Sequence, residues 1–319
     1  MSMPFGYVSP AQAMRDKAEF ARQGIARGRS CVTLQYEGGI LMMAPNTSSA
    51  LHKISEIYDR IAFAAVGRYP EFETLRKAGI TYADVAGYQF DRRDVTARGI
   101  AIYYAQNLGT IFTESLKPFE VEIVVAEVGE QPEGDQIYRI TFDGSVNDEP
   151  GFVAFGGQAD QVSAVLKERY SPGMSLSEAF GAALAALTAT GNGERTELAA
   201  NQLEVAILDR ARDHRTFRRI RAARLEELIA EARSADAKTA PETDPPDTGP
   251  APSGGSAPSG GSAPSTGSPP SGGSTGGSAP SGGGSAPSAG SEPPTGPDRG
   301  STDRGGGVGG GNTTPPNPL

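Results

Sequence analysis

The sequence predicts an α+β fold in which two antiparallel sheets pack face to face and helices cover both outer faces, a four-layer αββα sandwich. Strands that are adjacent in the sequence are joined by short turns, which favours antiparallel pairing, and the helices come in pairs between blocks of strands. In addition, residues 61–66 form a nearly continuous apolar run that ends at Gly67. Such a run is typical of a strand covered on both faces.

The first predicted element is an amphipathic helix. Ser9 is a favourable N-cap, Pro10 stands at the first helical position, and Gln12 is where a capping box needs it. Apolar or small residues then recur at helical spacing along one face, namely Met14, Ala18, Ala21 and Ile25. Gly28 ends this helix, and the next strand follows without a long linker.

The remaining elements are predicted from apolar runs, turn residues and caps. Strands are predicted at 31–36, 40–44, 53–58, 61–66, 119–128, 137–142, 152–155, 204–208 and 216–220. Further helices are predicted from Tyr69 to Gly79 or beyond, from Val95 to Lys117, from Gly157 to about Tyr170, from Ser175 to Thr188, and from Ala222 to about Arg233.

Composition divides the chain near Ala235. From there on no aromatic residue occurs, Gly, Pro, Ser and Thr dominate, and the apolar side chains larger than alanine are Val308 and Leu319. Such a segment cannot bury enough apolar surface to offset its ordering entropy. We therefore predict a flexible peptide at 1–8, one folded domain at 9–233 and a disordered tail at 234–319.

Charge and cysteine content exclude several classes of protein. The net charge of −9 over 319 residues argues against a nucleic-acid-binding role. One local run of arginines is an exception that we interpret as a solvated face, namely Arg215, Arg218, Arg219, Arg221 and Arg224. The single cysteine, Cys31, excludes an intramolecular disulfide and fits a reducing cytosol. Because neither a signal peptide nor a membrane span is recognisable, we expect a soluble, cytoplasmic protein with no membrane partner.

The sequence offers no familiar catalytic or cofactor motif. It has no glycine-rich phosphate loop and no Cys/His cluster with zinc spacing, and its two histidines, His52 and His214, are far apart. No Ser-His-Asp or Cys-His arrangement can be assembled from it. We therefore predict no cofactor, no metal and no catalytic residues.

Several short segments nevertheless occur in a specific order along the folded region. They are the Ser9-Pro10 helix start, Glu19–Ala21, Gly38-Gly39, Lys53-Ile54, Tyr58-Asp59, Val66-Gly67, Asp91–Val95 and Tyr138–Thr141. Together they resemble the α-type subunits of proteasomes in their actinobacterial form, over nearly all of residues 1–233. The resemblance implies the N-terminal-nucleophile hydrolase fold, which is the same four-layer sandwich, and outer heptameric rings that contact rings of β subunits.

The resemblance also implies that the family's catalytic machinery is missing here. Catalytic β-type subunits expose a threonine at the head of their first strand, supported by an acidic residue after the second strand and a lysine at the third. In this sequence the nucleophile position falls near Arg29, the acidic position is Pro45, and only the lysine is kept, as Lys53. A threonine nucleophile uses its own terminal amine as base, so a chain that continues upstream for some 28 residues cannot use that mechanism.

The same resemblance implies a docking pocket and a gate. On sequence alone, a lysine at a strand start is usually solvated, but in the family the lysine at the position of Lys53 meets the C-terminal carboxylate of an activator between neighbouring α subunits. Gly67 and, more weakly, Glu19 match further members of that pocket. The implied activator is the ring-shaped AAA ATPase of the Pup-dependent pathway. Residues 1–8 match the gating peptide, with Met3, Phe5, Tyr7 and Val8 as its pore-closing side chains.

Two other interpretations remain open from the residues. The first is a self-processing hydrolase that uses Ser30 or Cys31 as its nucleophile, which would lose the whole first helix on autolysis. The second is a scaffold ring without a protease. Intact mass tests the first, and co-purification with a threonine-type β subunit tests the second.

Overall fold

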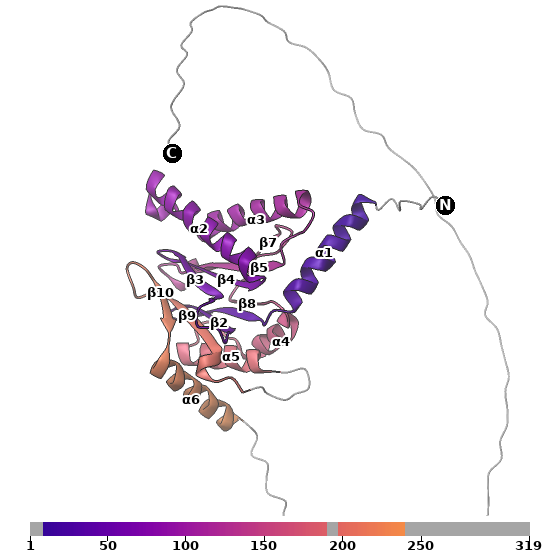
Figure 1. Ribbon diagram of the computed structural model, residues 1–319. Coiled ribbons are helices and arrows are strands. Elements are labelled where there is room, and N and C mark those ends of the chain that lie inside the picture. The colour runs from indigo at the N-terminus through magenta and orange to yellow at the C-terminus, as the bar shows by residue number, and fades with distance from the viewer. Residues whose placement is uncertain (1–8, 190–196, 240–319) are drawn as a thin grey trace, which may run out of the picture. The chain divides into compact units, whose positions relative to one another are not determined.

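The structure is a computed structural model that describes residues 9–189 and 197–239. The predicted gate residues Met3, Phe5, Tyr7 and Val8, and the tail from residue 240 onward, lie outside the described residues. The described chain forms two five-stranded sheets with helices on both outer faces (Figure 1). This arrangement confirms the predicted αββα sandwich.

The two sheets are antiparallel at every strand pair that is described. One sheet has the order β10-β9-β2-β1-β8, with β1 (Cys31–Tyr36), β2 (Gly39–Pro45), β8 (Phe152–Phe155), β9 (Leu203–Asp209) and β10 (Phe217–Ile220). The other has the order β3-β4-β5-β6-β7, with β3 (Ile54–Tyr58), β4 (Ile61–Gly67), β5 (Val121–Glu127), β6 (Gln136–Ile140) and β7 (Val146–Asp148). Strands β3 and β10 are therefore the edges on one side of the sandwich, and β7 and β8 are the edges on the other (Figure 1).

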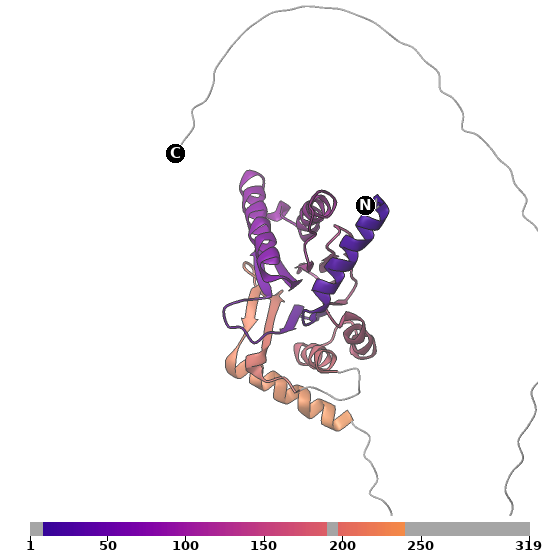
Figure 2. The same cartoon turned by 45° about the vertical axis from the view of Figure 1, so that its right-hand side comes forward.

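The helices form two outer layers and one separate element (Figures 1 and 2). One layer holds α2 (Tyr69–Gln89) and α3 (Ala97–Glu114), and the other holds α4 (Ala159–Arg169), α5 (Leu176–Thr188) and α6 (Ala222–Thr239). Short 3-10 helices occur at η1 (Arg92–Asp94), η2 (Pro132–Gly134) and η3 (Ala200–Gln202). Helix α1 (Pro10–Ala26) lies outside both layers and contacts β4 and β5.

Strand β4 shows how one apolar run serves two cores. Its residues Ala62 and Ala64 face the other sheet and join the layer between the sheets. Phe63 and Ala65 point the other way and pack under α2 and α3. Because both faces are covered, six of the seven β4 residues are buried, as the continuous apolar run predicts.

Helix α1 begins as predicted but without a reciprocal capping box. The Ser9 hydroxyl accepts a hydrogen bond from the Gln12 backbone N–H at 3.2 Å. The Gln12 side chain instead donates to Asp16 at 2.6 Å, because a carboxylate one turn along the helix is within its reach. A complete box forms at α5, where Ser175 and Glu178 cap each other.

Helix α1 packs against the domain through its C-terminal half. Ala21 and Ile25 are buried against Phe142, whereas Met14, which was predicted on the same face, is exposed. Gly24 lies so close to the Glu120 carboxylate that a Cβ atom would overlap it. The N-terminal half of α1 therefore has less support from the domain than the C-terminal half.

Two features differ from the sequence-based expectation. Strand β7 was missed because its three residues are all exposed, so an edge strand of this kind leaves no apolar alternation to detect. Its register is set by pairing with β6, for example Tyr138 opposite Asp148. Helix α6 runs on to Thr239 rather than ending near Arg233, because alanines continue the helix after the large apolar residues stop.

Candidate functional site

Lys53 stands directly before β3, where the start of that strand meets the head of β1. Its Nζ atom donates to the carbonyl oxygen of Arg29 at 3.2 Å. Burial lowers the pKa of the partly buried Lys53 ammonium below its usual value. In the described part of the chain no carboxylate forms an ion pair with this Nζ atom. The arrangement is a partly buried cation with unused donors, which suits an incoming carboxylate.

A buried glutamate that the sequence analysis did not single out holds this corner together. Glu204, on β9, is only 8% exposed. It accepts hydrogen bonds from the backbone N–H groups of Lys53 and Ile54, at 2.9 and 3.2 Å, and from the Asn46 and Arg219 side chains, at 2.8 and 2.6 Å. A buried carboxylate needs such donors to offset its lost hydration. The available signal was a charged residue directly before the apolar run 205–208 of the same strand.

Two glycines shape the same corner. Gly67, at the end of β4, has φ of +120°, and a side chain there would run into the carbonyl oxygen of Glu120. Gly28 lies beside it, since a Cβ atom on Gly28 would be 2.6 Å from Val66 and 3.5 Å from the Gly67 nitrogen. Lys53 and Gly67 therefore both lie against the link between α1 and β1. Gly28 belongs to this link, although the sequence predicted it only as a helix end.

Glu19 does not join this corner within one subunit. It is exposed on α1, and its carboxylate accepts a hydrogen bond from Gln23 at 3.0 Å, one turn along the same helix. Glu19 precedes Gly28 by nine positions, which is more than two helical turns. The fold thus brings together two of the three predicted pocket residues.

A cluster of four charged residues fixes the C-terminal half of α1. Glu120 is buried beneath Gly24, and its carboxylate lies 3.0 Å from Lys117 and 3.4 Å from Arg68. Glu71 completes the cluster, since it accepts from Lys117 at 2.6 Å and from the Glu120 backbone N–H at 2.6 Å. These contacts set the direction in which α1 leaves the sandwich. They therefore also set the position of the start of the described chain.

The head of β1 offers no reactive nucleophile. The Ser30 hydroxyl is buried and accepts a hydrogen bond from the Gln158 backbone N–H at 3.0 Å. Burial raises the pKa of the Cys31 thiol to about 12, so that the thiol stays protonated at neutral pH. The peptide that precedes Ser30 continues through Arg29 into α1. The geometry therefore gives no support to a hydrolase that uses either residue.

Residues 9–189 and 197–239, which the structure describes, contain neither a metal-binding cluster nor a membrane-spanning helix. No group of three or more His, Cys, Asp or Glu side chains there could hold a metal ion. None of the described helices combines the length and the apolar character that crossing a bilayer requires.

Known proteins match this chain over most of its folded region. A family model for proteasome subunits matches residues 25–208. The proteasome subunit alpha of Streptosporangium roseum is 66% identical over 252 residues, which cover 78% of this chain and 96% of that protein. Those of Thermomonospora curvata and Thermobifida fusca are 65% and 63% identical, covering 72% and 73% of this chain and 99% and 92% of their own length. This chain therefore belongs to the proteasome subunit family and groups with its actinobacterial α-type members.

Proposed function

We propose that this chain is the catalytically silent α-type subunit of a cytoplasmic proteasome core. Copies of it form the outer heptameric rings and contact β subunits, which carry the threonine active sites. Residues 1–8 close the pore at the ring axis. The corner around Lys53, with Gly67 and with Glu19 from a neighbouring copy, docks the C-terminal tails of a ring-shaped AAA ATPase that delivers Pup-tagged proteins.

The observation that carries this proposal is the unbroken link between α1 and β1. A threonine nucleophile of this fold needs a free α-amino group at the strand head to act as its base. Here the head of β1 is an internal peptide, and the Arg29 carbonyl accepts a hydrogen bond from Lys53. Lys53, which matches the lysine that supports the nucleophile in catalytic subunits, is thus hydrogen-bonded to the backbone that stands where those subunits have a free terminus. Catalysis therefore belongs to a partner subunit.

The docking role is supported by the chemistry of the same corner. The Lys53 ammonium has three donors and gives one to a backbone carbonyl, so that donors remain for a carboxylate. Gly28 and Gly67 let the chain pack closely at this corner, since side chains there would overlap Val66 and the Glu120 carbonyl oxygen. The sequence has no glycine-rich phosphate loop, so the energy for unfolding substrates would come from the docked ATPase.

Catalytic silence is tested by separating the two subunits. The α chain alone should hydrolyse no fluorogenic peptide and should keep its full mass. The co-expressed core should hydrolyse the peptide, and replacing the N-terminal threonine of the β subunit with alanine should abolish that activity. Peptide hydrolysis by the α chain alone, together with a mass loss before Ser30 or Cys31, would refute the proposal.

The gate is tested by deleting residues 2–8 from the α chain of the co-expressed core. Because the pore would lose its apolar plug, hydrolysis of short peptides should rise severalfold. Deletion of residues 240–319 is the matched control, since it shortens the other end of the chain and should leave the rate unchanged. An unchanged rate after deletion of residues 2–8 would rule out the gate.

A further inference from the structure

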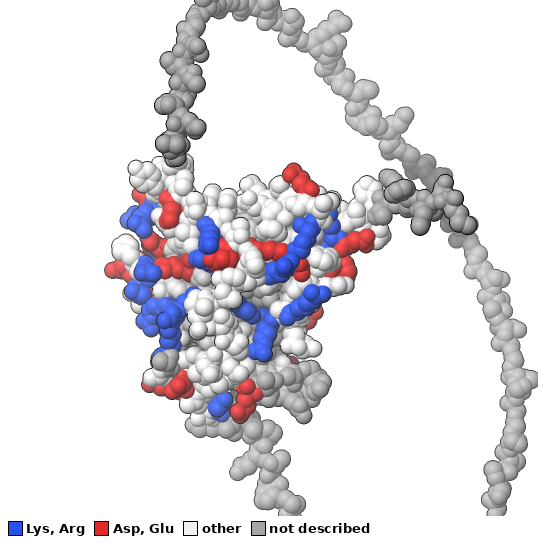
Figure 3. Space-filling view, viewed as in Figure 1, with Lys and Arg blue, Asp and Glu red and all other residues white. Residues whose placement is uncertain are grey.

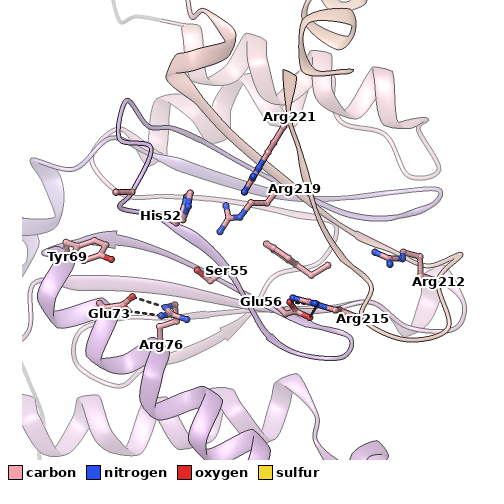
Figure 4. Close-up of a pocket in the computed structure, with 12 residues that line it drawn as sticks. His52, Ser55, Glu56, Tyr69, Glu73, Arg76, Arg212, Arg215, Arg219 and Arg221 are labelled. Carbon is pink, nitrogen blue, oxygen red and sulfur yellow. Dashed lines mark hydrogen bonds and ion pairs between the residues drawn. The ribbon is translucent and has the colours of Figure 1, made fainter. Parts of the chain in front are cut away.

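An arginine-lined cavity of about 880 Å³ opens at the β3/β10 edge of the sandwich. Five arginines line it, namely Arg76, Arg212, Arg215, Arg219 and Arg221. Lys and Arg side chains gather on the same flank, at the left of the space-filling view (Figure 3). In the close-up, Arg219 and Arg221 reach toward His52 from the β10 side (Figure 4). The cavity is thus a positive site on a chain whose net charge is −9.

The two glutamates of the cavity are already neutralised. Glu73 binds Arg76 through two hydrogen bonds of 2.7 and 2.8 Å, and Glu56 lies 3.0 Å from Arg215 (Figure 4). Arg219 is likewise engaged, because it binds the buried Glu204 described above. These pairs leave none of the cavity's own carboxylates for the remaining arginines.

Arg212 and Arg221 are the remaining arginines. Both are exposed, and their side chains make no hydrogen bond or ion pair with any residue in the described ranges. A guanidinium group binds carboxylates through paired donors in a fixed geometry, so the two side chains suit a carboxylate-bearing partner. The cavity is therefore incomplete in the isolated subunit.

The opposite side of the sandwich has a complementary character. Strand β7 is exposed at all three residues, and Asp148 has no hydrogen-bonded or ion-paired partner for its carboxylate among the described residues. The same holds for Asp160 in the first turn of α4, next to β8. Val146 is 39% exposed on this edge strand. An uncovered strand edge of this kind is a natural surface for another chain.

A ring of identical subunits requires contacts between two different surfaces of each copy, because only heterologous contacts close into a ring. The β3/β10 and β7/β8 edges lie on opposite sides of the sandwich, as such a contact requires (Figure 1). We propose that the arginine cavity of one copy receives the acidic β7/β8 edge of the next copy. Arg212 and Arg221 pair with Asp148 and Asp160 of that copy. This inference rests on the ring assembly proposed above.

Charge swaps test this pairing in the full chain co-expressed with the β subunit. Arg212→Glu with Arg221→Glu, or Asp148→Lys with Asp160→Lys, should reduce the yield of rings about tenfold or more, since like charges would face each other. The four substitutions together should restore the rings. Arg224→Glu is the matched control and should assemble normally, because this arginine pairs only within α6. Native mass spectrometry measures the ring yield, and circular dichroism shows that each variant is folded.

Three results would overturn the proposed contact. The first is a normal ring yield in the Arg212/Arg221 variant. The second is failure of the four-site swap to restore the rings that each two-site variant had lost. The third concerns the acidic tail segment at 242–247, the competing occupant of the cavity. If deletion of residues 240–319 abolished the rings as completely as the arginine variant, the tail would be the ligand. Absence of rings in the wild-type co-expression would instead refute the proposed function itself.

Discussion

Replacing Lys53 with alanine tests the docking corner. The Lys53 ammonium is partly buried, and its donor to the Arg29 carbonyl leaves two donors for a ligand. A hydrogen bond to a charged group contributes about 1.5–3 kcal/mol, so losing the contact with a peptide carboxylate should weaken binding by about 10- to 150-fold. Because burial lowers the pKa of Lys53, wild-type binding should weaken as the pH rises through that lowered pKa, where an ordinary lysine is still charged.

The assay is fluorescence anisotropy of a labelled peptide with the C-terminal sequence of the ATPase, titrated with the assembled core. Lys77→Ala is the matched control, because this lysine is 70% exposed on α2, away from the corner. A peptide with an amidated C-terminus should bind the wild type weakly, and its affinity should be the same for the Lys53→Ala variant. Equal affinity of the wild type and Lys53→Ala for the free-acid peptide would refute the reasoning.

Other substitutions and probes examine the packing around this corner. Glu204→Gln should lower the free energy of unfolding by about 2–4 kcal/mol, because Arg219 loses its buried counter-charge; an unchanged urea midpoint of the α chain would contradict this. Gly67→Ala should lower the free energy of unfolding by at least about 1–3 kcal/mol, because alanine is strained at this positive φ and its Cβ would overlap the Glu120 carbonyl oxygen; the melting temperature should fall. The Cys31 thiol should resist iodoacetamide in the native chain and react only after unfolding. Burial raises the pKa of the Cys31 thiol from 9.0 to about 12. Above pH 9.0 the unfolded chain therefore loses the thiol proton while the folded chain keeps it, so the free energy of unfolding should fall as the pH rises above 9.0.

Local patterns in the sequence predicted most of the fold. The Ser9 cap, the Ser175–Glu178 capping box and the apolar run of β4 each depend on neighbours in the chain or on simple burial. Strand β7 escaped detection because all its residues are exposed and only its pairing with β6 makes it a strand. The edge of a sheet is a property of the fold rather than of the local sequence.

The candidate site was predictable only in part, for a related reason. Lys53 and Gly67 came from the family resemblance, and the fold places both against the α1–β1 link. The Glu204 network joins β9 to residues about 150 positions away, which no local pattern reveals. The arginine run at 215–224 was interpreted as a solvated face, yet three of its members line one cavity with Arg76 from α2.

The central claim is that this chain forms the silent outer rings of a proteasome core. Electron microscopy of the chain co-expressed with its β subunit tests that claim most directly, with an antibody fragment bound to a tag after residue 319 to mark the α chain. We expect four stacked seven-fold rings with the label on the two outer rings. Labelled inner rings, or β rings that assemble without this chain bound, would contradict the account.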